Sequence, residues 1–446
     1  MKARSIISIL IVAYLYSPLS ANDRLPNFVV IFTDDQGYGD LGCYGHPTIR
    51  TPRLDRMAAE GMRFTQFYSA ASVCTPSRAA LLTGRLPIRT GLCADKLRVL
   101  IPDSAGGLPE REITIAEALK TKGYATICIG KWHLGHLPKY LPMNHGFDSY
   151  LGIPYSNDMK PTVLMRNEAI IENPADQTTL TQRYTAEAIQ FIKENRNKPF
   201  FLYLPHTFPH TPLFVSESFK GKSPRGLYGD VIAEIDWSTG KILDTLRELE
   251  LDKNTLVIFT SDNGPWLTQK QDGGSAGLLR DGKRTTFEGG MRVPTIAWWP
   301  GKIKAGATSH ALASTMDIFT TCLTLAGIKL PADRIIDGKN LTPVLLGTGP
   351  CERKVLFYYR GTKLMAVRKG SWKAHLITQG GLTRDADPAI VHDPPLLYRL
   401  EHDPSEKYDV SKNHPDVIAD ILKEVERHRA KLKPGKPQLQ KRLSGK

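Results

Sequence analysis

Two acidic segments of the sequence carry side chains that could bind a metal ion. Asp34 and Asp35 follow one continuous apolar run, and Asp262 and Asn263 follow a second one much later in the chain. Such runs are typical of buried parallel strands, and sites in open α/β sheets form at the carboxyl ends of strands. Three carboxylates and one amide offer only oxygen ligands, which favours Ca²⁺ first and Mg²⁺ second over zinc. Taken singly, either pair could simply cap a loop.

Cys74 opens the pentapeptide Cys-Thr-Pro-Ser-Arg, which ends at Arg78 and continues into an apolar stretch. Pro76 in the first turn predicts that a helix begins at the cysteine. The backbone N–H groups and the dipole of a helix favour an anion at its N-terminus. A helix start of this kind can also be purely structural.

Cationic and imidazole side chains follow two further predicted strands. Lys131 and His133 stand two residues apart on an extended segment, so that they point to the same side and could both face an anion. His206 and His210 follow another apolar run, and Lys283 stands in a glycine-flanked loop. Each of these residues, met alone, is more often structural or solvated than functional.

Together these motifs resemble the signature of the type I sulfatases, whose cysteine is oxidised to formylglycine. The resemblance rests on Cys-x-Pro-Ser-Arg followed by Leu-Thr-Gly-Arg, on Gly-Lys-Trp-His-Leu-Gly, and on Gly-Lys-x-Thr-Thr-x-Glu-Gly-Gly. It extends from Asn27 to about Val410. The chain is most similar to the arylsulfatase A-like branch in four segments: 42–47, 151–156, 277–290 and 372–375.

The resemblance implies a hydrolase of sulfuric esters that cleaves sulfate monoesters, expected to be those of a sulfated carbohydrate or glycoconjugate. The hydrate of formylglycine carries two hydroxyl groups. One attacks sulfur, and the other, once deprotonated, expels sulfate and restores the aldehyde. The implied cofactors are Ca²⁺, with Mg²⁺ second, and formylglycine derived from Cys74. The implied partners are the sulfated substrate and a formylglycine-generating or equivalent maturation enzyme.

The resemblance also implies a role for each matching residue. The expected metal ligands are Asp34, Asp35, the modified Cys74, Asp262 and Asn263. The expected substrate-binding residues are Lys131, Ser156, His210, Lys283 and His375.

Four further roles concern catalysis. Arg78 is expected to hold the formylglycine, and His133 to assist the diol and take the proton whose loss releases sulfate. His210, with Lys283, is expected to protonate the leaving oxygen. His210 is followed by x-Pro and matches the family's catalytic histidine better than His206, which is assigned to structure.

Hydrophobic patterning predicts the framework that would position these residues. The predicted strands are 27–33, 124–129, 199–204 and 255–260, and the predicted helices are 52–61, 114–122, 181–195, 228–251 and 415–432. Short strands at 355–360, 363–368 and 371–377 indicate an antiparallel sheet. The fold class is therefore α/β. With the resemblance, we expect an alkaline-phosphatase-like sandwich with a large mixed, mostly parallel central sheet flanked by helices, and a smaller C-terminal antiparallel sheet with a terminal helix.

The expected domain organisation begins with a signal peptide at 1–21, which has a basic start and a short apolar run and predicts a secreted or periplasmic protein. The alternative, a membrane anchor, is disfavoured because the run is too short to span a bilayer comfortably. A catalytic domain follows at 22–350, then a C-terminal subdomain at 351–432 and a basic flexible tail at 433–446.

The net charge of +14 suits a polyanionic substrate. Much of the excess lies in the tail, and no basic patch interleaved with aromatic residues indicates nucleic-acid binding. The six cysteines are widely spaced and predict neither a disulfide framework nor a zinc site. Arylsulfatase A has several disulfides that these cysteines do not reproduce, so its lipid specificity is not carried over.

Two alternatives to a sulfatase stay open from the sequence. A phosphate or phosphonate ester hydrolase of the same superfamily would use the same nucleophile. A non-catalytic binder of sulfated glycans would keep the fold, although it would be expected to lack part of the set of site residues, which here is complete.

Overall fold

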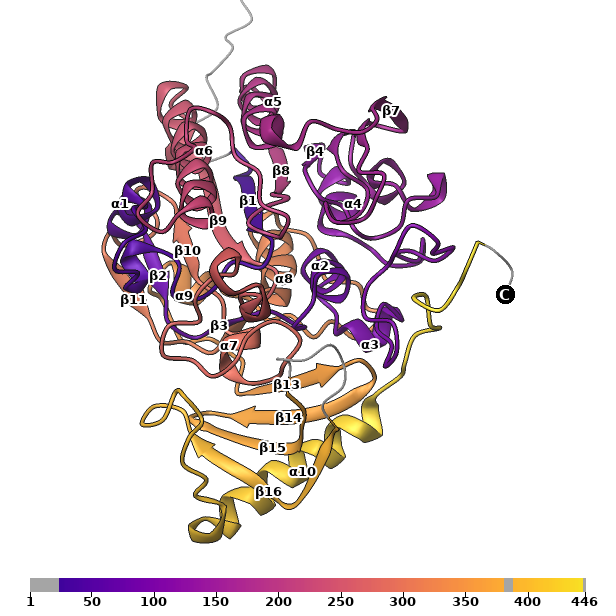
Figure 1. Cartoon of the computed structure of the whole chain (residues 1–446), viewed down its shortest axis with the longest axis vertical. Coiled ribbons are helices and arrows are strands. Elements are labelled where there is room, and N and C mark those ends of the chain that lie inside the picture. Colours follow the sequence, from indigo (N-terminus) through magenta and orange to yellow (C-terminus); the bar gives the residue numbers. More distant parts are fainter. Residues whose placement is uncertain (1–23, 381–387, 444–446) are drawn as a thin grey trace, which may run out of the picture.

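The computed structural model describes residues 24–380 and 388–443 of the chain (Figure 1). The predicted signal peptide at 1–21 lies outside the described residues. Within the described ranges, no helix combines the length and the apolar character that crossing a bilayer would require.

Strand β1 (Asn27–Thr33) lies near the middle of a ten-stranded sheet, and all its residues are buried. Phe28, Val30 and Phe32 belong to one hydrophobic cluster, and Val29 and Ile31 belong to another. Successive side chains of a strand point to opposite faces, so both faces of this sheet must be covered. The continuous apolar run in the sequence is the direct consequence of this double burial.

The sheet is mostly parallel at its centre and antiparallel towards its edges. In spatial order the strands are β11 (Ala307–Ser309), β2 (Met62–Phe64), β10 (Thr295–Trp298), β9 (Thr255–Ser261), β1, β8 (Phe200–Pro205), β4 (Ala125–Ile129), β5 (Ser149–Gly152), β6 (Leu164–Arg166) and β7 (Ala169–Glu172). Strands β9, β1, β8, β4 and β5 are parallel to one another, whereas β10, β6 and β7 are antiparallel to their neighbours.

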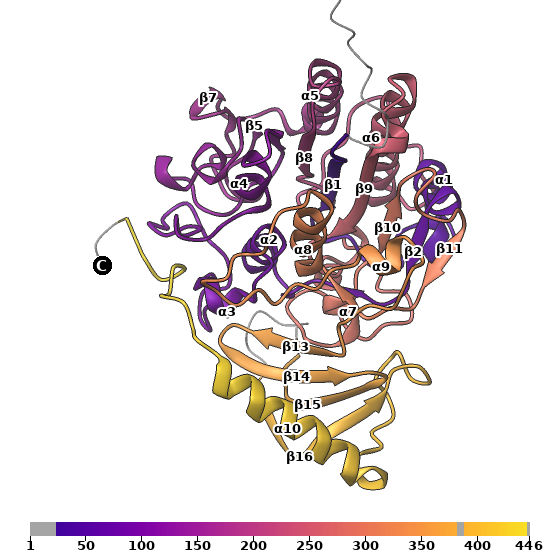
Figure 2. The ribbon, with the colours of Figure 1, turned by 180° about the vertical axis from the view of Figure 1, so that it is seen from behind.

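Helices cover the two faces of this sheet (Figures 1 and 2). One face packs against α1 (Pro52–Glu60), α5 (Leu180–Glu194) and α6 (Leu227–Glu248). The other packs against α2 (Cys74–Thr83), α4 (Ile115–Lys120) and α8 (Met316–Leu325). Shorter elements complete this part: β3 (Phe67–Tyr68), α3 (Pro87–Thr90), α7 (Glu288–Met291), β12 (Ala313–Ser314) and α9 (Thr342–Leu345).

A second, four-stranded antiparallel sheet follows in the C-terminal part, with helix α10 (Pro415–Lys431) across one face (Figure 2). Its strands are β13 (Val355–Arg360), β14 (Lys363–Lys369), β15 (Trp372–Thr378) and β16 (Ile390–Arg399). The predicted α/β architecture, with a large mixed sheet between helices and a small antiparallel sheet, is confirmed.

The segment that follows α10 differs from the predicted solvated tail. Gly435 and Gln438 donate backbone hydrogen bonds to the carbonyls of Ile88 (2.8 Å) and Gly91 (2.9 Å), so the chain runs back along α3. Leu439 is fully buried. The prediction was wrong for residues 433–443 because it used only the local run of charges, whereas the backbone groups and one leucine bind a surface that is distant in sequence.

Candidate active site

The acidic residues lie where two adjacent strands end. Strands β1 and β9 are paired along their whole length, and Asp34-Asp35 and Asp262-Asn263 leave the sheet side by side. The N–H of Asp35 donates to Oδ1 of Asp262 (3.1 Å), and Nδ2 of Asn263 donates to Oδ1 of Asp35 (2.8 Å). All four residues are buried.

Cys74 is the first residue of α2, as its position before Pro76 predicted. Its thiol is buried and donates to Oδ1 of Asp34 (3.3 Å). One turn further along the helix, the fully buried Arg78 donates from Nη2 to Oδ2 of Asp262 (2.8 Å) and from Nη1 to the carbonyl of Lys131 (2.9 Å). The guanidinium therefore fixes the start of α2 against the ends of two strands.

The exit of β4 brings Lys131 and His133 to the same place. The ammonium of Lys131 pairs with Asp34 and donates to Oγ of Ser156 (3.1 Å). Nε2 of His133 lies 2.8 Å from the carbonyl of Leu100 and must donate to it, which leaves Nδ1 as an acceptor without a partner among the described residues. Burial, and then the charge of Lys131, lowers the pKa of His133 well below its usual range, so the imidazole is neutral.

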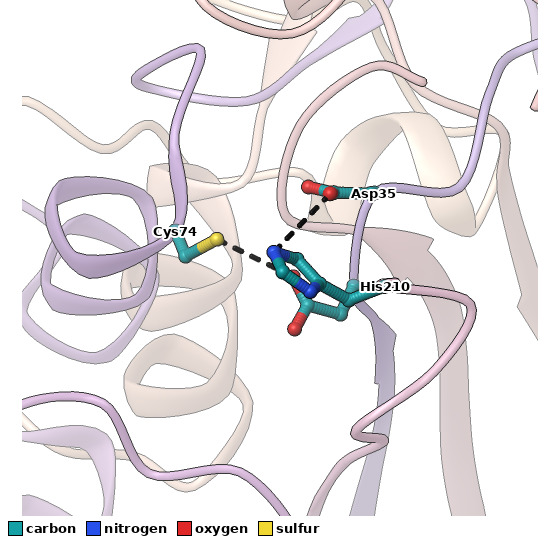
Figure 3. A group of neighbouring side chains, drawn as sticks. Asp35, Cys74 and His210 are labelled. Carbon is teal, nitrogen blue, oxygen red and sulfur yellow. Dashed lines mark hydrogen bonds and ion pairs between the residues drawn. The ribbon is translucent and has the colours of Figure 1, made fainter. Parts of the chain in front are cut away.

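His210 presents Nε2 to the site, whereas His133 presents Nδ1. Nδ1 lies 2.6 Å from the carbonyl of Thr211 and donates to it, whereas Nε2 lies 3.6 Å from Oδ2 of Asp35. Figure 3 shows the ion pair between the Asp35 carboxylate and this ring, with the Cys74 side chain beside the same cluster. Burial, and then the charge of Lys283, lowers the pKa of His210 to about 3.

His206, which the sequence analysis assigned to structure, is fully buried. Neither of its ring nitrogens has a hydrogen-bond partner in the described part of the chain.

Lys283 approaches from the loop before α7, and its ammonium donates to Oδ2 of Asp35 (2.6 Å). A glycine holds this loop close to the end of β9. A Cβ added to Gly264 would lie 1.8 Å from the carbonyl oxygen of Gly289, so no larger residue fits there. The close approach keeps the Asp262-Asn263 turn and the lysine loop in one rigid unit.

The pKa values of two carboxylates in the cluster are shifted in opposite directions. Burial would raise the pKa of Asp34, but Lys131, His210 and Arg78 lower it well below its ordinary value. Burial together with the neighbouring Asp34 carboxylate raises the pKa of Asp262 to about 7. Oδ1 of Asn263 is buried and has no partner among the described residues.

A buried amide oxygen without a hydrogen-bond partner costs free energy unless a ligand contacts it. Asp34, Asp35, Cys74 and His210 also each place one potential ligand atom within 4.8 Å of the others. The residues therefore fit a hard divalent cation, with carboxylate and amide oxygens as its ligands.

The structure brings together all but one of the residues that the sequence analysis singled out for the site. His375 is the exception. It is fully buried on β15, where its Nε2 lies 2.6 Å from Oε1 of Glu406, with its ring beside Phe287. The motif around His375 is part of the contact between the C-terminal sheet and the part of the chain that carries the site. The expectation that His375 binds substrate was therefore wrong.

Other residues of the site were missed from the sequence. Asn157 and Trp266 contact His210, through Oδ1 (3.1 Å) and through the indole ring (5.2 Å between ring centroids). Both are neighbours in sequence of predicted site residues, which was the available signal. Arg98 and Arg284 line a cavity that leads to Cys74. Arg284 directly follows the predicted site residue Lys283, whereas nothing in the local sequence of Arg98 distinguishes it from a solvated arginine.

Comparisons with known proteins agree with this geometry. The family model described as Sulfatase matches residues 26–328, and that of the C-terminal region of aryl-sulfatase matches residues 351–444. N-acetylgalactosamine-6-sulfatase of Rattus norvegicus is 44% identical, over 93% of this chain and 87% of the relative. Arylsulfatase A of Homo sapiens is also 44% identical, over 92% of this chain and 88% of the relative.

Among solved structures, the PsFucS1 sulfatase from Pseudoalteromonas sp. has a TM-score of 0.85 at 31% identity, covering 91% of this chain and 90% of its own. The match therefore includes both the helix-covered sheet and the C-terminal sheet. With the site geometry, these likenesses show that the chain belongs to the sulfatase family, in the branch that includes arylsulfatase A, and that it is a hydrolase of sulfuric esters.

Proposed function

We propose that the chain hydrolyses sulfate monoesters of a sulfated carbohydrate or glycoconjugate, with formylglycine at position 74 and Ca²⁺ as the metal. One observation carries the proposal. Cys74 heads a helix and is buried between the carboxylate of Asp34 and the side chains of Lys131, His210 and Lys283. Relatives named for the sulfate of a sugar, such as N-acetylgalactosamine-6-sulfatase, support a carbohydrate substrate.

Asp34, Asp35, Asp262 and Asn263, together with the modified residue 74, would hold the metal. When bound, the ion polarises sulfate oxygens and lowers the pKa of a coordinated hydroxyl group. Mg²⁺ is the second choice, because it demands a near-ideal octahedral geometry whereas Ca²⁺ accepts a more flexible set of oxygen ligands. Formylglycine, as its hydrate, supplies a nucleophile that a buried thiol cannot, because burial and the Asp34 charge raise the pKa of Cys74 well above its usual range.

The other side chains bind sulfate and move protons. Lys131, Ser156 and Lys283 would contact sulfate oxygens, and the positive charge of the two lysines would offset the charge that develops during transfer. Nδ1 of His133, which has no hydrogen-bond partner among the described residues, is an acceptor and would take a proton from the group at residue 74. Nε2 of His210, whose other nitrogen is held by Thr211, would deliver a proton to the leaving oxygen after the bound anionic substrate has raised the pKa of the ring and Nε2 has taken up that proton.

The proposal includes a maturation partner and an export route. A formylglycine-generating or equivalent enzyme is needed to oxidise Cys74, and the expected signal peptide at 1–21 would direct the chain to a secreted or periplasmic location. The sulfated substrate is the second expected partner.

The experiment that tests the proposal combines chemistry at residue 74 with turnover. The peptide that contains Cys74, from protein produced with a maturation enzyme, should have the mass of the aldehyde or its hydrate. Cys74→Ala should abolish hydrolysis of sulfate esters while leaving the thermal unfolding midpoint close to that of wild type. Near-normal turnover by Cys74→Ala would refute the nucleophile. A higher rate on aryl phosphate than on aryl sulfate would favour the phosphatase alternative.

A further inference from the structure

A cavity, partly open to solvent, leads down to Cys74. At its base are buried residues of the site, among them His133 and His210. Its mouth is formed by residues that the proposed chemistry does not use, among them the partly exposed Trp266 and Arg284. The question is what part of a substrate these outer residues would contact.

Trp266 marks the side of the cavity on which the leaving group lies. Its ring is 5.2 Å from the His210 ring, and the ammonium of Lys283 lies 4.3 Å from its centre. His210 and Lys283 are the proposed donors to the leaving oxygen, so the group attached to that oxygen must lie beside the indole. A half-buried indole offers a large, rigid apolar surface that suits the C–H face of a sugar ring.

Arg284 extends this platform with a positive charge. Its guanidinium carbon lies 5.2 Å from the centre of the Trp266 ring. Within residues 24–380 and 388–443 no carboxylate forms an ion pair with it, whereas the neighbouring Lys283 is paired with Asp35 at 2.6 Å. A cation stacked on an indole and left without a carboxylate is free to bind an anionic group of a ligand.

The backbone of Arg284 also requires explanation. Its φ of 77° lies in the left-handed region, which a non-glycine residue seldom adopts, and its N–H is held by the carbonyl of Ser72 at 2.9 Å. Such conformations cost free energy and tend to persist where they serve a site. Here the turn allows consecutive residues to serve two purposes: Lys283 pairs with Asp35 and Arg284 lies over Trp266.

A second segment of the cavity lining carries further positive charge. Lys96 and Arg98 line the cavity from the segment that follows α3. This segment is fixed to the C-terminal sheet, because Asp95 accepts hydrogen bonds from the N–H (2.7 Å) and the hydroxyl (2.9 Å) of Thr362. Among the described residues that line the cavity, Asp158 carries a carboxylate, and Lys96, Lys283 and Arg284 carry positive charges.

We infer that the outer part of this cavity is a subsite for a sugar that carries a second acidic group, a carboxylate or another sulfate, bound by Arg284 beside Trp266. This rests on the proposed function, because the position of the leaving group follows from the roles of His210 and Lys283. The preferred substrate is then an anionic oligosaccharide rather than an isolated aryl sulfate or a neutral sugar sulfate.

The test compares four sulfate esters: nitrophenyl sulfate, a monosulfated N-acetylhexosamine, the same sugar linked to a uronic acid, and the same sugar with a second sulfate. Arg284→Gln removes the charge and keeps most of the length of the side chain. On the ester linked to a uronic acid, on the ester with a second sulfate, or on both, Arg284→Gln should lower kcat/KM about 10- to 100-fold. This loss should be at least tenfold larger than the loss on nitrophenyl sulfate. The ester that shows the loss identifies the second acid as carboxylate or sulfate.

Arg399 provides a matched control, because it is exposed and stacks on Trp372 at 5.5 Å in the C-terminal sheet, outside the cavity. Arg399→Gln should leave all four rates as in wild type. An equal loss on all four esters in Arg284→Gln would overturn the inference, since the arginine would then merely support the lysine loop. Equal wild-type rates on the neutral and the doubly acidic sugars would overturn it as well.

A binding measurement separates this inference from the proposed function. Calorimetry with Cys74→Ala and the doubly acidic saccharides does not depend on turnover, and adding Arg284→Gln to that variant should weaken binding about 10- to 100-fold. If that loss is seen but wild type hydrolyses none of the esters, the subsite stands and the sulfatase proposal fails. If binding does not change, the subsite is refuted whatever the rates.

Discussion

At the scale of single residues, the two histidines of the site face it with different nitrogens. The carbonyl of Leu100 holds Nε2 of His133 and leaves Nδ1 as an acceptor. The carbonyl of Thr211 holds Nδ1 of His210 and leaves Nε2 towards the acidic cluster. Backbone carbonyls thus fix the tautomer of each neutral ring, so that both rings present an unprotonated nitrogen to the cluster. Nδ1 of His133 can accept a proton, and Nε2 of His210 can donate one once it has taken up a proton.

The role of His210 predicts a loss that depends on the leaving group. An alkoxide of a sugar needs a proton to depart, whereas nitrophenolate needs little help. His210→Ala should therefore lower kcat/KM about 10²- to 10⁴-fold on a sugar sulfate and much less on nitrophenyl sulfate.

His206→Ala is the matched comparison, because His206 is also a buried histidine of the same loop. It should cost less on both esters. Rates of both variants on both substrates decide the matter. If the loss that depends on the leaving group appears in His206→Ala instead, the assignment of the two histidines is wrong.

The oxygen ligands predict a dependence on calcium that stability can report. Chelation should remove activity and lower the unfolding midpoint, and Ca²⁺ should restore both, by about 2.7 kcal/mol of unfolding free energy at a hundredfold excess over Kd. Asn263→Ala should reduce that stabilisation, because it removes a buried carbonyl oxygen without another partner among the described residues. Calorimetric scans with Ca²⁺, Mg²⁺ and Zn²⁺ check this. Restoration by zinc alone would contradict the ligand set.

At the scale of elements, the sequence predicted strands and helices whose signals are local. β1 and β9 carry continuous apolar runs, and α4 begins at a capping box formed by Thr114 and Glu117, so their positions were correct to within two or three residues. The packing of one element on another was not predictable in this way. Lys373 and Glu406 look like ordinary surface residues in the sequence, yet both are fully buried.

These two residues connect the small sheet to the loop that carries Lys283. The ammonium of Lys373 lies 3.0 Å from Oε1 of Glu288 and 2.9 Å from Oε1 of Glu406, and it donates to the carbonyl of Thr286 (2.8 Å). Oε2 of Glu406 accepts from the N–H of Glu288 (2.7 Å). The C-terminal sheet therefore holds the start of α7, only a few residues after the lysine of the site.

Glu406→Gln should destabilise the protein by about 3–5 kcal/mol, because it breaks a buried charge pair. It should also lower kcat by loosening the lysine loop. Asp420→Asn, which breaks an exposed pair with Lys369, should cost at most about 1 kcal/mol. Urea unfolding of both variants measures the difference in unfolding free energy. Equal losses would contradict the view that Lys373 and Glu406 hold the start of α7.

The contribution of Glu406 to stability depends on pH. Burial alone would raise the pKa of Glu406, but Lys373 and His375 lower it from 4.5 to about 2. Its contribution to stability is therefore complete above about pH 4.5 and is lost as the pH falls towards 2. The difference in unfolding free energy between wild type and Glu406→Gln should shrink over that interval.

At the scale of the whole molecule, the chain returns to its catalytic part after forming the small sheet. Residues that follow α10 lie along α3, and both views show this return (Figures 1 and 2). The sequence signal was a basic run with prolines, which is the usual composition of a solvated segment. Long-range packing of one apolar residue, Leu439, outweighed that composition.

Leu439→Ala should lower the unfolding free energy by about 2–5 kcal/mol, because it leaves a cavity under the returning segment. Leu443→Ala is the control from the same segment: Leu443 is 50% exposed, and its truncation should change stability by less than about 0.5 kcal/mol. Thermal unfolding followed by circular dichroism compares them. If the two variants are equally stable, the segment does not contribute to the fold.

The order of the strands along the chain also determines how long Cys74 stays exposed during synthesis. Cys74 is buried beneath partners that the ribosome adds much later, including Asp262 and Asn263, which follow it by roughly 190 residues. At about 5–20 residues per second, roughly 10 to 40 s pass before that cover can form. The proposed oxidation of Cys74 would take place within this interval, while the cysteine is still exposed on the nascent chain. A chain that completes β9 unmodified buries its thiol in the folded protein.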